Sequence, residues 1–277
     1  MERLYYAEVV GCLNFLSVGS WWQRAVNSMS FDEYLAHLAD RLKRWKLEGV
    51  VGVKTIRAYT QGLAVGDPTT ADARRIYESN PLRADERARG ILQDLLFRHV
   101  LRQCDRLDLP VQIHAGFGWW KLDPLHLEKA RATLLVPLFE HPDFRNVRFM
   151  VFHGSWPYTA EMAYLASIYE NVYLDFNCMA PLSGEMLERA LSEWLDIVPL
   201  HKLMTGTDGS ILEICGAVAS ETRRVLAKVL AKKIEEDLYT EELALEAAHA
   251  ILHRNAEEAY QLSVPSQPTA ESSPRDS

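Results

Sequence analysis

The chain has 277 residues, a length that suits one large domain or two small ones. Hydrophobic residues make up 48% and charged residues 25%, which is typical of a globular protein. With 30 Lys and Arg against 38 Asp and Glu, the net charge is −8, and this acidity argues against a nucleic-acid partner. No apolar run approaches the ~20 residues of a membrane span, and the opening residues lack the pattern of a signal peptide. The four cysteines are widely spaced and form no CxxC pair. Together these features predict a cytoplasmic protein with no membrane partner.

Short β-type runs alternate with helical patterns along most of the chain. In chain order, the predicted strands cover residues 4–10, 50–56, 111–114, 147–153, 172–176 and 202–208. The predicted helices cover residues 31–47, 85–107, 124–138, 160–169, 184–194, 220–234 and 240–260. Ser30 and Glu33 have the spacing of a capping box at the start of the first helix. The alternation predicts βα units and a parallel sheet, in either a barrel or an open doubly wound arrangement.

The last residues have a different composition from the rest of the chain. Residues 263–277 are rich in Pro, Ser and charged residues and lack an apolar stripe, so they predict a disordered tail. Residues 1–262 contain no repeat and no change of composition, and we interpret them as one domain. The predicted strands number six, whereas a complete (β/α)8 barrel has eight.

Three polar residues, His114, His153 and Asp208, lie at the carboxyl ends of predicted strands. In a barrel these ends point into the mouth that holds the active site. Each residue is followed by small residues, which let the backbone and a ligand approach closely. Two imidazoles and a carboxylate that meet at one face suit a divalent metal such as zinc.

Lys54 also ends a predicted strand, and its position allows two interpretations. Its head group either reaches solvent along an apolar stem or faces the mouth. In the mouth it would pair with a substrate carboxylate or carry a modification. Trp119, in the loop after His114, is interpreted as part of a wall or lid over the mouth rather than as exposed surface.

Several short motifs resemble those of the amidohydrolase superfamily. The run Phe152–Tyr158 (FHGSWPY), followed by residues 171–175 (NVYLD), resembles its sixth- and seventh-strand region. Gln112–Gly116 and Gly206–Asp208 are similar to the fifth-strand histidine and eighth-strand aspartate motifs, and residues 251–260 fit a terminal Asn-Ala helix. The resemblance covers most of residues 3–262. It is strongest to the amidohydrolase-related (amidohydrolase 2) branch, which includes aminocarboxymuconate-semialdehyde decarboxylase and the nodulin-like amidohydrolases.

The resemblance implies a metal-dependent TIM barrel that binds a divalent metal, zinc or else manganese. His114, His153 and Asp208 would be metal ligands, with Asp208 shuttling a proton and His153 stabilising developing negative charge. Lys54 lies in a stretch similar to the nodulin-like fourth strand, so it is a candidate carboxylated ligand. By the same analogy, a small carboxylated substrate would contact four residues, namely Lys54, Arg57, Trp119 and Trp156.

The sequence departs from the family at its first metal ligands. Family members begin with a first-strand His-x-His, and none of the nine histidines here forms one. Leu4–Glu8 aligns best with the third strand of the family, so we expect an incomplete barrel that contains strands three to eight.

Three interpretations follow from this departure. In the first, the chain is a metal-dependent hydrolase of C–N or ester bonds, with a nonoxidative decarboxylase as the alternative within the same branch. In the second, the chain is a catalytically inactive homologue that acts as a binding or regulatory domain. Its open strand edges would then be covered by a partner, by a second copy in a homodimer or by a lipid-like ligand. In the third interpretation, the true start of the protein lies upstream of Met1.

Overall fold

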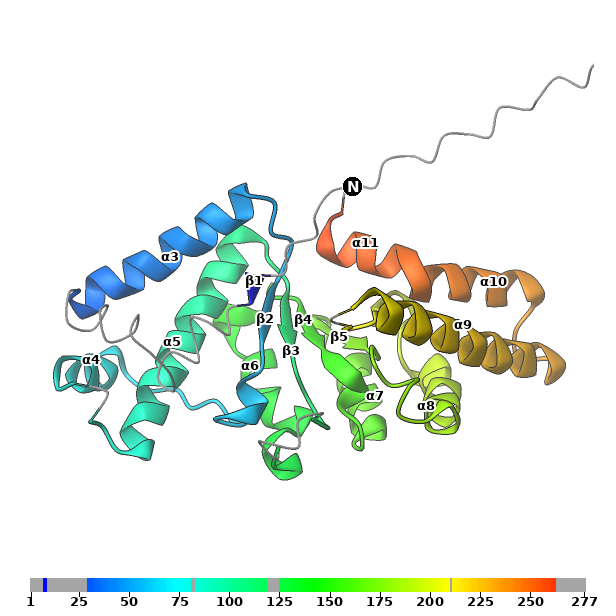
Figure 1. Cartoon of the computed structure of the whole chain (residues 1–277), viewed down its shortest axis with the longest axis horizontal. Coiled ribbons are helices and arrows are strands. Elements are labelled where there is room, and N and C mark those ends of the chain that lie inside the picture. Colours follow the sequence, from blue (N-terminus) through cyan, green and yellow to red (C-terminus); the bar gives the residue numbers. More distant parts are fainter. Residues whose placement is uncertain (1–6, 9–28, 81–82, 119–124, 210, 263–277) are drawn as a thin grey trace, which may run out of the picture.

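A single parallel sheet forms the centre of the molecule (Figure 1). The structure is a computed structural model that describes residues 7–8, 29–80, 83–118, 125–209 and 211–262. Within these residues, six strands pair in the order β1-β2-β3-β4-β5-β6, and every pair is parallel. The strands are β1 (Ala7–Glu8), β2 (Val53–Thr55), β3 (Val111–Ile113), β4 (Phe149–Val151), β5 (Val172–Asp175) and β6 (Leu203–Met204). The predicted parallel βα architecture is therefore confirmed.

The helices pack around this sheet and connect its strands. They are α3 (Phe31–Leu47), α4 (Thr70–Glu78), α5 (Glu86–Leu107), α6 (Val136–Phe139), α7 (Thr159–Ile168), α8 (Gly184–Ile197), α9 (Leu212–Glu235), α10 (Glu241–His249) and α11 (Asn255–Tyr260). In Figure 1, the first three helices lie to the left of the strands, and the last three lie to the right. A π-helical turn, Ala250–Arg254, joins α10 to α11.

The local sequence signals for α3 are confirmed. The Ser30 side chain accepts a hydrogen bond from the Glu33 backbone, and the Glu33 side chain accepts one from the Ser30 backbone. Tyr34, Leu38 and Leu42 recur at helical spacing and are all buried. The cap and the apolar stripe therefore agree on where this helix begins and which face it turns to the core.

The register of the sheet brings the polar strand ends to one edge. Lys54 of β2 pairs with Gln112 of β3, and Ile113 of β3 pairs with Val151 of β4. Every residue of β3 and β4 is buried, as expected for parallel strands that are covered on both faces. The residues that follow β3 and β4 therefore leave the core at neighbouring points of the same edge.

One predicted helix, over residues 124–138, is wrong. The chain forms two 3-10 turns there, Leu127–Lys129 and Ala132–Leu135, before the short α6. The carbonyl of Lys129 accepts from the Leu63 backbone, and that of Ala130 accepts from the Gly116 backbone. These long-range hydrogen bonds use acceptors that a continuous helix would need for its own turns.

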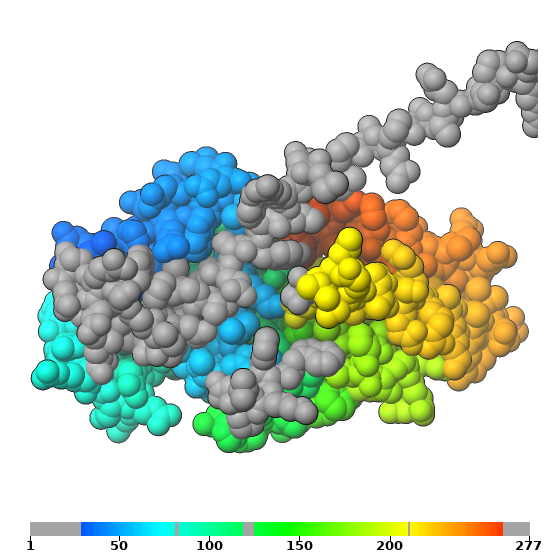
Figure 2. Space-filling model, viewed as in Figure 1, coloured from blue at the N-terminus to red at the C-terminus, as the bar shows by residue number. Residues whose placement is uncertain are grey.

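Two further helices differ from the prediction. Helix α4 was not predicted, although Thr69 caps it by accepting from the Asp72 backbone. Helix α9 begins at Leu212 rather than near residue 220, and its first turn lies on the surface (Figure 2), where Leu212 is 84% exposed. In the part of the chain that the structure describes, no helix is long and apolar enough to cross a membrane.

A buried ion pair fixes the segment that follows β2. Arg57 Nη2 lies 2.8 Å from Asp94 Oδ1, and Arg57 Nε donates to the Gly62 carbonyl at 2.8 Å. The other Asp94 oxygen accepts from the Gly66 backbone at 2.8 Å. The Arg57 side chain is 2% exposed and that of Asp94 is 18% exposed. This pair therefore ties residues 57–66 to α5.

We expect Arg57→Ala to lower the free energy of unfolding by about 3–5 kcal/mol, because it leaves the Asp94 carboxylate without its cation. Urea-induced equilibrium unfolding measures this loss. The matched control is Arg75→Ala, because Arg75 pairs with Asp72 while its side chain is 76% exposed. That change should cost less than about 1 kcal/mol, and equal losses in both variants would contradict a stabilising role for the buried pair.

Candidate functional site

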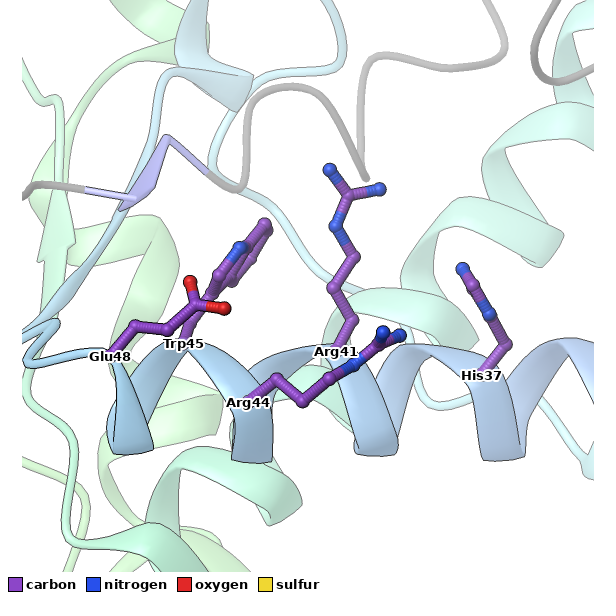
Figure 3. A pocket seen from close by; sticks show the side chains of 5 residues that line it. All are labelled: His37, Arg41, Arg44, Trp45 and Glu48. Atoms are coloured by element: carbon purple, nitrogen blue, oxygen red, sulfur yellow. The ribbon is translucent and has the colours of Figure 1, made fainter.

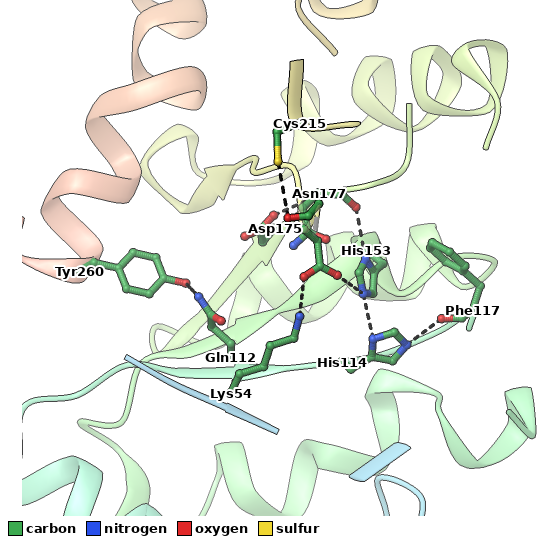
Figure 4. Close-up of polar contacts among 11 residues, drawn as sticks. Lys54, Gln112, His114, Phe117, His153, Asp175, Asn177, Cys215 and Tyr260 are labelled. Atoms are coloured by element: carbon green, nitrogen blue, oxygen red, sulfur yellow. Dashed lines mark hydrogen bonds and ion pairs between the residues drawn. The ribbon is translucent and has the colours of Figure 1, made fainter. Parts of the chain in front are cut away.

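Four of the predicted site residues lie together at the carboxyl edge of the sheet (Figure 4). Lys54 Nζ is 2.6 Å from Asp208 Oδ1, and the second carboxylate oxygen, Oδ2, is 3.8 Å from His153 Nε2. His153 Nε2 lies 2.9 Å from His114 Nδ1. The four side chains come from β2 and from the residues that follow β3, β4 and β6. Because β6 is not a neighbour of β2 in the strand order, the contact between Lys54 and Asp208 shows that the sheet curves around the site.

Unusual backbone conformations aim these side chains inward. His153, Ser155 and Asp208 have φ values of 61°, 52° and 45°, in the left-handed region that residues other than glycine seldom adopt. Such conformations cluster at functional sites because the surrounding structure must hold them in place. Gly116 also has a positive φ, and a Cβ at its position would lie 2.2 Å from the Trp156 carbonyl. Glycine is therefore required where the loops after β3 and β4 touch.

Backbone carbonyls face the outer ring nitrogens of both histidines. His114 Nε2 lies 2.7 Å from the Phe117 carbonyl, and His153 Nδ1 lies 3.3 Å from the Asn177 carbonyl. A carbonyl can only accept, so each contact favours an N–H on the outer side of its ring. When both carbonyls are satisfied, His114 Nδ1 and His153 Nε2 face each other with lone pairs. That arrangement is favourable only with a cation between or beside them.

Burial keeps both imidazoles neutral at physiological pH. Burial, together with the neighbouring His153, lowers the pKa of His114 to about 3. Burial likewise lowers the pKa of His153 to about 3, although its contact with the Asn177 carbonyl opposes the shift. A neutral imidazole is the form that binds a metal ion.

The donor types of this site fit a divalent metal. Ligands of a tetrahedral zinc ion lie about 3.3 Å apart, because each is about 2.0–2.1 Å from the metal. The His114–His153 and His153–Asp208 separations of 2.9 and 3.8 Å fall on either side of that value. Nevertheless, within the described ranges no three His, Cys, Asp or Glu side chains are already gathered as a ligand set. Asp208 is directed to the Lys54 ammonium instead.

Aromatic rings enclose the polar group. The Tyr59 ring centroid lies 4.6 Å from that of His114, and the Phe117 centroid lies 5.1 Å from that of His153. Lys54 Nζ stands 4.7 Å above the Phe152 ring, a cation–π contact. These rings exclude water from the imidazoles, which is the cause of their lowered pKa values.

The remaining predicted residues have different surroundings. The Arg57 Nε and Nη2 atoms donate to Asp94 and to the Gly62 and Ala64 carbonyls, so this side chain holds the fold. Trp156 packs edge-on against Phe117 at 5.9 Å, which places it one ring away from His153. Trp119 lies outside the described residues.

Sequence reasoning missed Asp175 and Asn177. Asp175 ends β5, and its Oδ1 accepts from the Asn177 backbone at 2.8 Å. Burial raises the pKa of Asp175 to about 7, although the hydrogen bonds from Asn177 oppose the shift. The available signal was its position, because Asp175 is the last residue of β5, close to the carboxyl edge that His114 occupies after β3.

A second concave surface lies on the outer helix α3 (Figure 3). It encloses about 300 Å³ and is lined by His37, Arg41, Arg44, Trp45 and Glu48, with the Arg41 guanidinium 4.8 Å from the Trp45 ring centroid. None of the predicted site residues belongs to it. The strand-end cluster therefore remains the candidate site.

A family model described as Amidohydrolase matches residues 26–262, and the chain belongs to this family. The chain is also 32% identical over 227 residues to Protein fluG of Emericella nidulans. That match covers 77% of this chain but only 26% of the relative, so the chain spans about a quarter of the length of that relative. The resemblance to the amidohydrolase superfamily is thereby confirmed.

Solved structures show that the fold is that of TIM barrels. A protein from Lactobacillus casei ATCC 334 assigned as a metal-dependent hydrolase has a TM-score of 0.72 and 19% identity, over 90% of this chain and 62% of the other. Uronate isomerase from Thermotoga maritima has a TM-score of 0.70 and 15% identity, over 92% of this chain and 60% of the isomerase. Glucuronate isomerase from Caulobacter crescentus has a TM-score of 0.73 and 17% identity, over 95% of this chain and 59% of the isomerase. The chain therefore covers about three fifths of each of these barrels.

The two buried histidines predict that the protein loses stability in acid. Between about pH 3 and 6.5 the unfolded chain binds protons at His114 and His153 that the folded chain does not. The free energy of unfolding should therefore rise with pH in this window, by about 1.4 kcal/mol per pH unit for each histidine. Denaturant unfolding in the presence of a chelator measures this slope.

The comparison between wild type and His153→Gln isolates the contribution of one histidine. The variant should lose about 1.4 kcal/mol per pH unit of slope, whatever its absolute stability. Asp175, with its raised pKa, contributes a slope of opposite sign that both proteins share. An unchanged slope in the variant would contradict a neutral, buried His153.

Proposed function

We propose that the chain is a metal-dependent hydrolase that cleaves a C–N or ester bond in a small carboxylated substrate. The observation that carries the proposal is the pair of neutral imidazoles whose inner nitrogens face each other 2.9 Å apart beside Asp208. Membership of the amidohydrolase family and a fold shared with metal-dependent hydrolases support it.

In this proposal His114, His153 and Asp208 hold the metal, which is zinc or else manganese. When bound, the metal would polarise the scissile group and lower the pKa of a water molecule. His114 and His153 contribute neutral nitrogen donors that are held by the Phe117 and Asn177 carbonyls. The Asp208 carboxylate would accept the proton that the attacking water loses and pass it to the leaving group. Its Oδ2 lies 3.8 Å from His153 Nε2, on the side of the proposed metal ligands.

Lys54 supplies the positive charge that recognises the substrate. The Lys54 side chain is 13% exposed, and its ammonium pairs with Asp208. A substrate carboxylate would share this ammonium with Asp208, and Trp156 would form a wall of the same space.

Two other functions remain candidates, each favoured by a specific observation. A nonoxidative decarboxylase would use the same donors, with Lys54 next to the carboxylate that leaves. An inactive binding or regulatory domain is favoured by the Lys54–Asp208 contact, because an ammonium at 2.6 Å already neutralises the carboxylate. Metal uptake separates the second candidate from the two enzymes, and product analysis separates the enzymes from each other.

We expect the metal-free protein to take up about one zinc ion per chain, and His114→Ala or His153→Ala to abolish this uptake. Dialysis against zinc or manganese followed by elemental analysis measures it. The matched control is His249→Ala with His253→Ala, a surface pair whose ring centroids lie 5.5 Å apart on the helical segment that leads into α11. Uptake below ~0.1 metal per wild-type chain would refute the enzyme proposal.

Asp208→Asn should reduce turnover by roughly 10²–10⁴-fold, because the amide cannot carry the proton. The assay is acid release from a panel of small carboxylated amides and esters, with zinc-loaded protein. Asp32→Asn is the matched control, since Asp32 pairs with Arg74 on the surface and its side chain is 69% exposed. Unchanged turnover in Asp208→Asn would remove the proposed proton shuttle.

A further inference from the structure

We propose that the Lys54–Asp208 pair couples two binding events at the site, so that a divalent cation and a carboxylate anion each strengthen binding of the other. Asp208 Oδ1 lies 2.6 Å from Lys54 Nζ, and Asp208 Oδ2 lies 3.8 Å from His153 Nε2. One oxygen of the carboxylate is thus held by the ammonium, while the other faces a proposed metal ligand. The coupling rests on the proposed function, because it takes place among the residues proposed to hold the metal.

The surroundings of the pair give its charge balance a large effect. The side chains of Lys54 and Asp208 are 13% and 30% exposed, and that of His153 is 0% exposed. Lys54 Nζ also lies 4.7 Å from the centroid of the Phe152 ring, which covers it on one side. Charges that are partly removed from water interact more strongly than charges at the surface, and an unbalanced charge is costly there. In the Lys54–Asp208 pair, one positive charge is balanced by one negative charge.

Asp175 is a further carboxyl group whose charge acts on the pair. Its Oδ1 accepts from the Asn177 backbone at 2.8 Å, and burial raises its pKa to about 7. At about pH 6 most Asp175 side chains are therefore uncharged, and the two buried imidazoles are neutral as well. Under this condition Lys54 and Asp208 are the two charged members of the cluster.

Each ion would take one member of the pair and release the other. A divalent cation bound by Asp208 would leave two net positive charges at the site, because the Lys54 ammonium stays beside it. A carboxylate anion bound by Lys54 would remove one of these charges and free Asp208 from the ammonium. Both effects have the same sign, so the two affinities rise together. Because binding is linked, the anion must raise the affinity for the cation by the same factor as the cation raises the affinity for the anion.

The test titrates the full-length protein, freed of metal by a chelator and then of the chelator by dialysis, with zinc and with acetate at about pH 6. We expect acetate to tighten zinc binding by about 5–150-fold, the usual range for two coupled sites, and zinc to tighten acetate binding by the same factor. Isothermal titration calorimetry of each ion, in the absence and in the presence of the other, measures both factors.

Three variants separate this coupling from direct binding of acetate to zinc. Lys54→Gln should bind zinc more tightly than wild type without acetate, because Asp208 has lost the competing ammonium, and acetate should no longer change its zinc affinity. Lys54→Met removes the same charge and replaces Lys54→Gln if that variant fails to fold. Asp208→Asn should bind acetate more tightly than wild type in the metal-free state. The matched control is Lys228→Gln, because Lys228 pairs with Glu188 at 2.7 Å while its side chain is 61% exposed, and every affinity should stay unchanged.

Equal zinc affinity with and without acetate in wild type would overturn the inference, and so would coupling that survives in Lys54→Gln. Weaker zinc binding by Lys54→Gln would also contradict it, because Lys54 would then assist the cation rather than compete with it. A wild type that binds zinc under neither condition would refute the proposed function instead. In that case the acetate affinity of Asp208→Asn decides the inference, and a value equal to that of wild type would overturn it.

Discussion

The site depends on two imidazole rings that are buried close together. His114 Nδ1 and His153 Nε2 lie 2.9 Å apart, and burial lowers the pKa of each ring to about 3. Neutral rings in this position must either share a proton or turn their lone pairs to a common cation. The surrounding aromatic rings, the two backbone carbonyls and the left-handed turn at His153 all contribute to holding this arrangement.

The Lys54–Asp208 pair introduces a competition at the same place. Asp208 is the only predicted ligand that carries a negative charge, and Lys54 Nζ lies 2.6 Å from one of its oxygens. An ammonium and a divalent cation compete for a carboxylate, so the balance of charge among Lys54, Asp208 and an incoming anion governs how the site is used. A carboxylated substrate would relieve this competition by giving the ammonium a second partner.

Family membership and fold similarity constrain the function to different degrees. The amidohydrolase match spans residues 26–262, whereas the solved barrels share only 15–19% identity with this chain. At that identity the likeness concerns the fold, and one fold supports many reactions through the residues at its strand ends. The isomerases and the hydrolase among these structures illustrate this point. The strand-end side chains, rather than the barrel, therefore carry the functional argument.

The sequence by itself determined the parallel βα architecture, the cap of α3 and the meeting of His114, His153 and Asp208 at one edge. These features depend on local periodicity and on the rule that parallel strands end at the same side. Only the tertiary structure decided the partners of the site. Arg57 pairs with Asp94, the Lys129 and Ala130 carbonyls accept hydrogen bonds from distant segments, and the Phe117 and Asn177 carbonyls face the outer nitrogens of the two histidines. Every residue has a backbone carbonyl, so its direction leaves no mark in the sequence and depends on contacts between distant segments.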